Sequence, residues 1–207
     1  MGSPSKSEEA LILAREDAGE NHLKLRLLCQ ESGLVLGMQR QSRSGKTSKN
    51  PIPDLFDLIQ VTLNLPKTGG TGLYFMGECH IIRRHPGLGK QYSRLKAAGD
   101  YARLLIRNAA HLEDHDRLFT RTCRFFEILE QTDLPQVAFL KALFLFLREE
   151  GYPLKEDWWN RLPPPARSRT THYLNDPLDK IEVTAPSPDS ILDSLVHWTR
   201  AHTDILV

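Results

Sequence analysis

The sequence has few cysteines, almost no net charge and no long hydrophobic run, and each shortage excludes a class of protein. Three scattered cysteines among 207 residues cannot form a disulfide framework and are typical of a protein in a reducing cytoplasm. The formal net charge is +1, so binding of a polyanion must depend on where the cations lie. The most apolar stretch, 134–147, is too short to cross a membrane, and the polar residues 1–9 do not resemble a signal peptide. We therefore expect a cytoplasmic protein without a membrane segment.

The hydrophobic pattern changes near residue 86. Before it, the pattern favours short strands, and in the clearest of them Leu23, Leu25 and Leu27 alternate with His22, Lys24 and Arg26. A third strand begins at Gly33 and places Leu34, Leu36 and Met38 on one face. The predicted strands are 10–15, 22–27, the strand from 33, 55–65 and 73–82. Five short antiparallel strands predict a small closed barrel such as an OB-fold, although an SH3-like barrel would give a similar pattern.

After residue 86 the apolar residues recur at helical spacing. One predicted stripe runs from Tyr92 and Leu95 through Ala98 to Ala109, and a second contains Leu118, Thr122, Phe125 and Leu129. The segment 134–148 is apolar on nearly every side, which indicates a central helix. Residues 153–186 are proline-rich and predicted to be irregular, and the last helix should begin at 187–189. The sequence thus predicts an α+β protein with an OB-fold barrel over residues 1–85 and a helical bundle over residues 86–207.

Cations gather in the first domain without matching carboxylates, because no acidic residue lies between Glu31 and Asp54. If the barrel places them on one face or rim, they suit a phosphate backbone. Tyr74 is the candidate for stacking on a base, whereas Phe75 should point to the other face. The alternative is that these cations only keep exposed loops hydrated. The predicted DNA-binding residues are Lys24, Arg26, Arg40, Arg43, Lys46, Lys49, Arg83, Arg84 and Tyr74.

The sequence contains no complete motif for an enzymatic or a metal site. The sequence 45–47, Gly-Lys-Thr, ends like a phosphate-binding loop, but Arg40 stands where that motif needs glycine, and the following Asn50-Pro51 prevents the required helix. No CxxC pair or nucleophile motif is present, so we expect no catalytic residue, no metal and no cofactor. A basic strip on the first predicted helix could meet an acidic peptide, although an ordinary hydrated helix face would look the same. Its members are Lys90, Arg94, Lys96, Arg103 and Arg107.

Short motifs along nearly the whole chain resemble the RecO family of bacterial DNA repair and recombination proteins. They are 10–13 (Ala-Leu-Ile-Leu), 19–21 (Gly-Glu-Asn), 31–34 (Glu-Ser-Gly-Leu), 72–78, His85-Pro86 and the helix ending in Gly151-Tyr152. The resemblance implies an OB-fold and a helical domain. It also implies binding of single- and double-stranded DNA, strand annealing, and loading of the recombinase RecA with the help of RecR. A further implied partner is the acidic C-terminal tail of single-strand-binding protein.

The chain departs from this family after Gly151-Tyr152. Many relatives carry a four-cysteine zinc module there, whereas this sequence has no cysteine in 153–165 and has Lys155-Glu156-Asp157-Trp158-Trp159 instead. We therefore expect no zinc and expect tryptophan packing to hold this segment. The departure leaves open a second hypothesis, a non-catalytic scaffold that docks the acidic tail without strong DNA binding.

Overall fold

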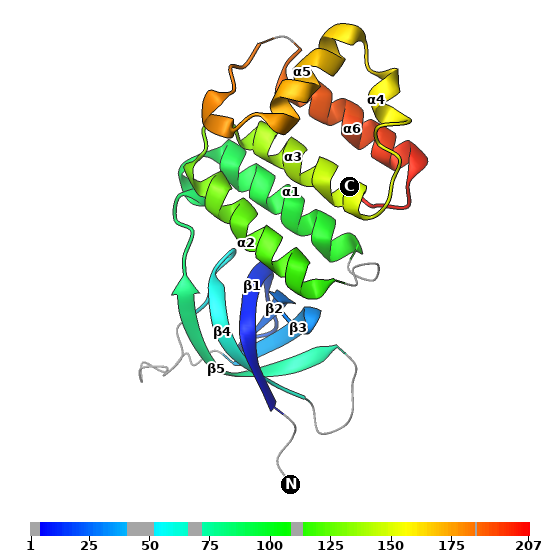
Figure 1. The fold of residues 1–207 in the computed structure, drawn as a ribbon. Helices are drawn as coiled ribbons and strands as arrows, with labels where there is room; N and C mark the ends of the chain where they lie inside the picture. The colour runs from blue at the N-terminus through cyan, green and yellow to red at the C-terminus, as the bar shows by residue number, and fades with distance from the viewer. Residues whose placement is uncertain (1–4, 41–51, 66–71, 109–113, 185) are drawn as a thin grey trace. The chain divides into compact units, whose positions relative to one another are not determined.

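The chain folds into two compact units, seen in a computed structural model that describes residues 5–40, 52–65, 72–108, 114–184 and 186–207 (Figure 1). The first unit comprises residues 1–86 with 108–126, and the second comprises 87–107 with 127–207. The change of pattern near residue 86 therefore marks a real boundary. The division differs from the predicted 1–85 and 86–207, because 108–126 belongs with the barrel.

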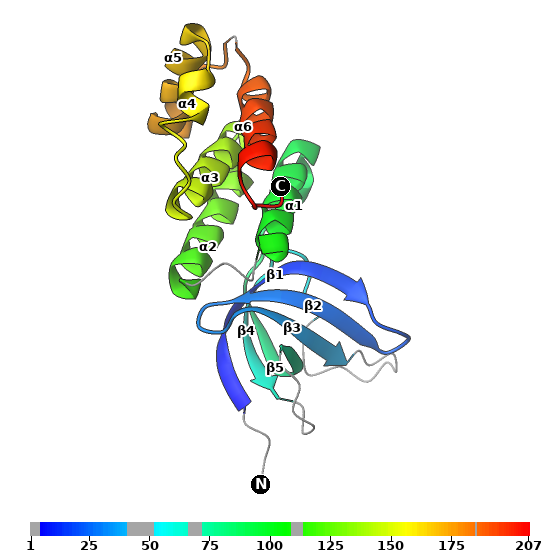
Figure 2. The same cartoon turned by 90° about the vertical axis from the view of Figure 1, so that its right-hand side faces the viewer.

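The first unit contains a closed barrel of five strands in the order β1-β2-β3-β5-β4, which is an OB-like arrangement (Figure 2). The strands are β1 (Ser5–Asp17), β2 (His22–Cys29), β3 (Gly33–Arg40), β4 (Leu58–Asn64) and β5 (Leu73–Arg83). The α+β class and the N-terminal barrel are as predicted. The prediction that all strands pair antiparallel is wrong, since β3 and β5 are parallel. A ring with an odd number of strands cannot alternate direction throughout, so one neighbouring pair must be parallel.

The barrel interior is filled by alternate residues of each strand. The leucines of β2 point inward as predicted, and Lys24 and Arg26 lie on the opposite face. On β3, Val35 is in the core, whereas Leu34, Leu36 and Met38 are only half-buried. These three residues share a face, as the sequence predicts, and it is the outer face of the barrel. The buried core consists of Ala10, Ile12, Leu23, Leu25, Leu27, Cys29, Val35, Ile59, Val61, Leu63 and Cys79.

The other regular elements of the described chain are helices. They are η1 (Leu88–Lys90), α1 (Tyr92–Asn108), α2 (His115–Gln131), α3 (Pro135–Glu149), α4 (Trp158–Arg161), α5 (Pro164–Asn175), η3 (Leu178–Lys180) and α6 (Pro188–His202). The central position of α3 and the buried stripe of α2 are confirmed. On α1 the predicted stripe is wrong at its start, because Tyr92 and Leu95 are exposed while Ala98 is buried. None of the helices within the described ranges has the length and apolar character needed to cross a membrane.

The prediction of an irregular segment over 153–186 is also wrong, because it holds α4, α5 and η3. Helix α5 begins at Pro164, inside the triple proline. Proline is tolerated in the first helical turn, since the backbone N–H that it lacks would have no acceptor within the helix. Tryptophan packing is confirmed: Trp158 is buried, its ring centroid lies 6.1 Å from that of Phe144, and its indole N–H donates to Ser194 at 3.2 Å. Helix α6 begins as predicted, with the Ser187 side chain accepting from the Ser190 amide.

Candidate nucleic-acid interface

Three of the predicted cations lie together on the outer surface of β2 and β3. The register pairs His22 with Arg40, Lys24 with Met38, and Arg26 with Leu36. Residues directly opposite one another in an antiparallel pair point to the same side of the sheet. Because the leucines of β2 occupy the interior, these pairs form the outside, which we name the β2–β3 outer face. Its cations are Lys24, Arg26 and Arg40.

The aromatic residue beside this face is Phe75 rather than Tyr74. In the parallel pairing of β3 with β5, Met38 stands opposite Phe75 and Gly37 opposite Tyr74. Phe75 is 47% exposed, whereas Tyr74 packs against the barrel core. The predicted orientations of the two rings are therefore both wrong: Phe75 is on the outside, and Tyr74 points towards the core. Alternation along β5 indicated that the two rings point to opposite sides, but only the register with β3 decides which is outside.

The three cations differ in their ion pairing. The Lys24 ammonium lies 3.3 Å from a carboxylate oxygen of Glu16, its cross-strand neighbour on β1. An exposed pair of this kind contributes about 0–1 kcal/mol, so a phosphate can displace the carboxylate at little cost. Arg26 and Arg40 form no ion pair with any residue that the structure describes. The β2–β3 outer face thus presents two arginines ready for an anion.

The remaining predicted cations are not part of this cluster. Arg83 pairs in register with Leu58 and lies eight residues beyond Phe75, which corresponds to about 26 Å along an extended strand. Arg84 acts instead on Asp57, whose carboxyl pKa is raised mainly by burial and is partly drawn back by the positive charge of Arg84. The expectation that all these cations share one face or rim is therefore wrong for Arg83 and Arg84. The predicted residues Arg43, Lys46 and Lys49 lie outside the described residues.

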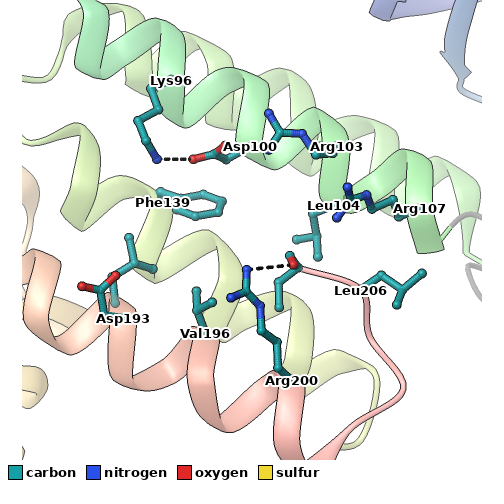
Figure 3. Close-up of a pocket in the computed structure, with 12 residues that line it drawn as sticks. Lys96, Asp100, Arg103, Leu104, Arg107, Phe139, Asp193, Val196, Arg200 and Leu206 are labelled. Atoms are coloured by element: carbon teal, nitrogen blue, oxygen red, sulfur yellow. Dashed lines mark hydrogen bonds and ion pairs between the residues drawn. The ribbon is translucent and has the colours of Figure 1, made fainter.

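The second unit holds a basic cavity of about 500 Å³ that we name the α1–α6 groove (Figure 3). Among the residues that the structure describes, four cations and the two aspartates Asp100 and Asp193 line it. Phe139 of α3 and Val196 of α6 contribute apolar wall, and Figure 3 shows Arg103 and Arg107 extending from α1 above them. The cations are Lys96, Arg103, Arg107 and Arg200.

The α1–α6 groove includes part of the basic strip predicted on the first helix. Lys96, Arg103 and Arg107 line it, but the exposed Lys90 does not. The Lys96 ammonium lies 2.6 Å from Asp100, and this hydrogen bond raises the pKa of Lys96, which therefore stays charged. Arg200 was missed by sequence reasoning, because it lies almost 100 residues further along the chain and no local signal links it to α1.

Arg94 is a correction to the predicted partner-binding set. It is buried and donates three hydrogen bonds, to the carbonyl oxygens of Glu130 at 2.8 Å and Thr132 at 2.9 Å and to the Asp133 carboxylate at 3.1 Å. Its charge is thus used inside the helical unit and is not presented to a partner. The helical spacing places Arg94 on α1 correctly, but its side chain is buried against the end of α2 and the residues that follow it.

Within the ranges that the structure describes, no group of three or more His, Cys, Asp or Glu side chains is placed to hold a metal ion. A scan against protein-family models and a search of curated proteins both find no match for this chain. The protein thus combines an OB-like barrel with a helical unit. The barrel carries the cationic β2–β3 outer face beside Phe75, and the helical unit carries the basic α1–α6 groove.

Proposed function

We propose that the chain is a non-enzymatic DNA repair and recombination accessory protein of the RecO type, which binds single- and double-stranded DNA and anneals complementary strands. The observation that carries this is the β2–β3 outer face, where Lys24, Arg26 and Arg40 lie beside the exposed ring of Phe75. In OB-folds the face of strands 2 and 3 is a common site for oligonucleotides. Cooperation with RecR and RecA is part of the proposal through the family resemblance of the sequence.

The physical basis is charge neutralisation combined with stacking. Each phosphate neutralised by a cation releases condensed counterions, which makes binding favourable and salt-dependent. A base can stack on an exposed aromatic ring whatever its identity, so Phe75 would bind without sequence preference. Two strands whose phosphates are neutralised repel one another less, and complementary bases can then meet. No covalent step is required, and the active groups would be the cations of the face.

Arg26 and Arg40 are the two arginines of the β2–β3 outer face that would contact phosphates. The double substitution Arg26→Gln/Arg40→Gln is expected to weaken binding of labelled oligothymidylate about tenfold and to reduce the slope of log K against log salt by about 1.4, because two phosphate contacts are lost. Fluorescence anisotropy titrations across a series of KCl concentrations measure both quantities. Both side chains belong to the outer face, so the thermal midpoint should stay near that of the unsubstituted protein.

A matched control removes one lysine and one arginine elsewhere. Lys90→Gln/Arg124→Gln neutralises two exposed side chains that lie on neither the β2–β3 outer face nor the wall of the α1–α6 groove. It should leave affinity and salt slope nearly unchanged. Equal affinity of the face variant and this control, or binding that does not respond to salt, would contradict the proposal.

A second candidate function is docking of an acidic peptide in the α1–α6 groove. Four cations surround apolar wall there, which suits a peptide with carboxylates and an apolar end. We propose the acidic tail of single-strand-binding protein as this partner. The Arg103→Gln/Arg107→Gln variant is expected to bind an acidic, phenylalanine-ended nonapeptide about tenfold more weakly, since two charge-assisted contacts are lost.

Isothermal titration calorimetry with the same peptide measures this effect, and Lys90→Gln/Arg124→Gln again serves as the control for lost charge. Absence of binding to the unsubstituted protein at high micromolar peptide would remove the docking candidate and leave the DNA proposal untouched.

A further inference from the structure

The helical unit contains a second, larger cavity, of about 640 Å³, that we name the α3–α5 groove. Its α3 side is built from residues at helical spacing of three and four, which places them on one face of the helix. Its α5 side has the same spacing, and Lys155 and Trp159 come from the segment after α3. The lining residues are Lys141, Phe144, Leu145, Arg148, Lys155, Trp159, Thr171, Leu174 and Asn175.

The charge of this groove is of one sign. Three of its lining residues are cations, and none of those within the described part of the chain is acidic, in contrast to the α1–α6 groove with its two aspartates. Arg148 and Lys155 are exposed, and their side chains form no hydrogen bond or ion pair with any described residue. Lys141 is half-buried and donates to the backbone carbonyl of Asp176. Desolvation lowers the pKa of Lys141, so an anion in the groove would stabilise its charged form.

An aromatic surface lies beside these cations. Trp159 is half-buried, and its ring meets that of the buried Trp158 edge to face at a centroid distance of 6.3 Å. Trp158 is held in turn by Ser194 and Phe144, so Trp159 stands on a fixed support. The Trp159 indole N–H has no acceptor among the described residues. Thr171 and Asn175 add exposed polar groups at the rim.

We infer that the α3–α5 groove binds a nucleotide of a single-stranded nucleic acid, with the base against Trp159 and the phosphates at Arg148 and Lys155. This inference rests on the proposed function and adds a second site to it, on the helical unit. The volume lies within the roughly 300–1,000 Å³ typical of cavities that enclose small ligands. Unpaired cations beside an aromatic ring are the combination by which proteins hold single strands without reading sequence.

An acidic peptide is the competing occupant, and the structure favours the nucleotide. A nucleotide supplies a flat base for the indole and a phosphate for the cations within one unit, whereas an acidic peptide has a single terminal ring and carries its carboxylates on other residues. A strand also carries a phosphate at each nucleotide, so that successive phosphates can meet the two separate cations while a base lies against Trp159. A protein with one site on each unit could hold two strands at once, which annealing requires.

The test uses the full chain and two independent groove variants. Trp159→Ala is expected to weaken binding of labelled oligothymidylate about tenfold through lost stacking, and Arg148→Gln/Lys155→Gln to weaken it by a similar factor. Because Arg148 and Lys155 are exposed, the charge variant should fold normally even if Trp159→Ala does not. Lys90→Gln/Arg124→Gln is the matched control for charge. In addition, an oligonucleotide carrying 5-iodouracil should cross-link on irradiation to the peptide that contains Trp159.

Each groove variant is also combined with Arg26→Gln/Arg40→Gln, so that the two sites can fail separately. If Arg148→Gln/Lys155→Gln lowers the affinity for oligothymidylate, in the unsubstituted protein or in the Arg26→Gln/Arg40→Gln background, the result supports nucleotide binding in the α3–α5 groove. This holds even if Arg26→Gln/Arg40→Gln alone binds normally and the barrel proposal fails. Groove variants that bind like the charge control overturn the inference, whatever the barrel variant does. The inference is also overturned, in favour of the peptide, if the groove binds an acidic peptide but does not bind oligothymidylate.

Discussion

Replacing Arg94 with methionine is expected to lower the free energy of unfolding by about 3 kcal/mol, a large effect for a single arginine on a helix that the sequence presents as basic and hydrated. The side chain is 10% exposed. Its guanidinium donates to the carbonyl oxygens of Glu130 and Thr132, at the end of α2, where the last carbonyl groups have no donor within the helix. Methionine keeps a side chain of similar length but removes the donors of all three hydrogen bonds.

The Asp133 carboxylate contributes less to this effect. It lies 3.1 Å from the Arg94 guanidinium, but its side chain is 88% exposed, and water screens such a pair strongly. Asp133→Asn should therefore lower the free energy of unfolding by well under 1 kcal/mol. The main stabilisation by Arg94 comes from its bonds to the two part-buried carbonyl acceptors.

Chemical denaturation followed by circular dichroism measures the Arg94 prediction. The matched control is Arg107→Met, at an exposed position of the same helix, which should be nearly neutral for stability. An Arg94→Met protein as stable as the Arg107→Met protein would show that the buried hydrogen bonds do not support the fold.

The substitution Gly33→Ala is expected to destabilise the protein by about 3 kcal/mol, from a strained backbone and a steric clash together. Gly33 begins β3 with a φ of 68°, in the left-handed region that favours glycine. A Cβ there would lie 2.6 Å from the Nε2 atom of His115, the first residue of α2. The backbone cannot easily move away, because the buried Glu8 carboxylate accepts from the amides of Glu31 and Ser32, at 3.0 and 3.1 Å, so the half-buried His115 ring must move instead.

Gly19→Ala is the matched control, since Gly19 has nearly the same φ of 70° but nothing within 4 Å of an added Cβ. It should cost only the backbone strain, about 1–2 kcal/mol. In a His115→Ala background the cost of Gly33→Ala should fall towards that of Gly19→Ala, because the clashing ring is gone. Thermal and urea denaturation of the unsubstituted protein, the three single variants and the Gly33→Ala/His115→Ala double variant measure these differences. If Gly33→Ala costs no more than Gly19→Ala, the turn does not pack against His115 as described.

Much of the barrel follows from alternation alone. Leu23, Leu25 and Leu27 could be placed inside, and Lys24 and Arg26 outside, because burying one face of a strand fixes the direction of every second side chain. Alternation could not orient β5, where both Tyr74 and Phe75 are aromatic and either ring would be acceptable in a core. The pairing of Phe75 with Met38 resolves this, and pairing between distant strands is a tertiary property.

The candidate sites depend even more on tertiary contacts. Arg26 and Arg40 come onto one face only through the β2–β3 register, and Trp159 and Arg148 line one groove only because α4 lies near α3 and α5. Arg94 shows the opposite effect, since packing removes a cation from the surface that helical spacing alone would leave there.

The sequence by itself determined the barrel, the buried α3, the proline start of α6 and the change of architecture near residue 86, because each depends on periodicity or on capping chemistry within a short segment. Only the tertiary structure decided which ring is exposed, which arginine is buried and which cations share a groove. Those outcomes depend on contacts between residues far apart in the chain, and no local pattern encodes them.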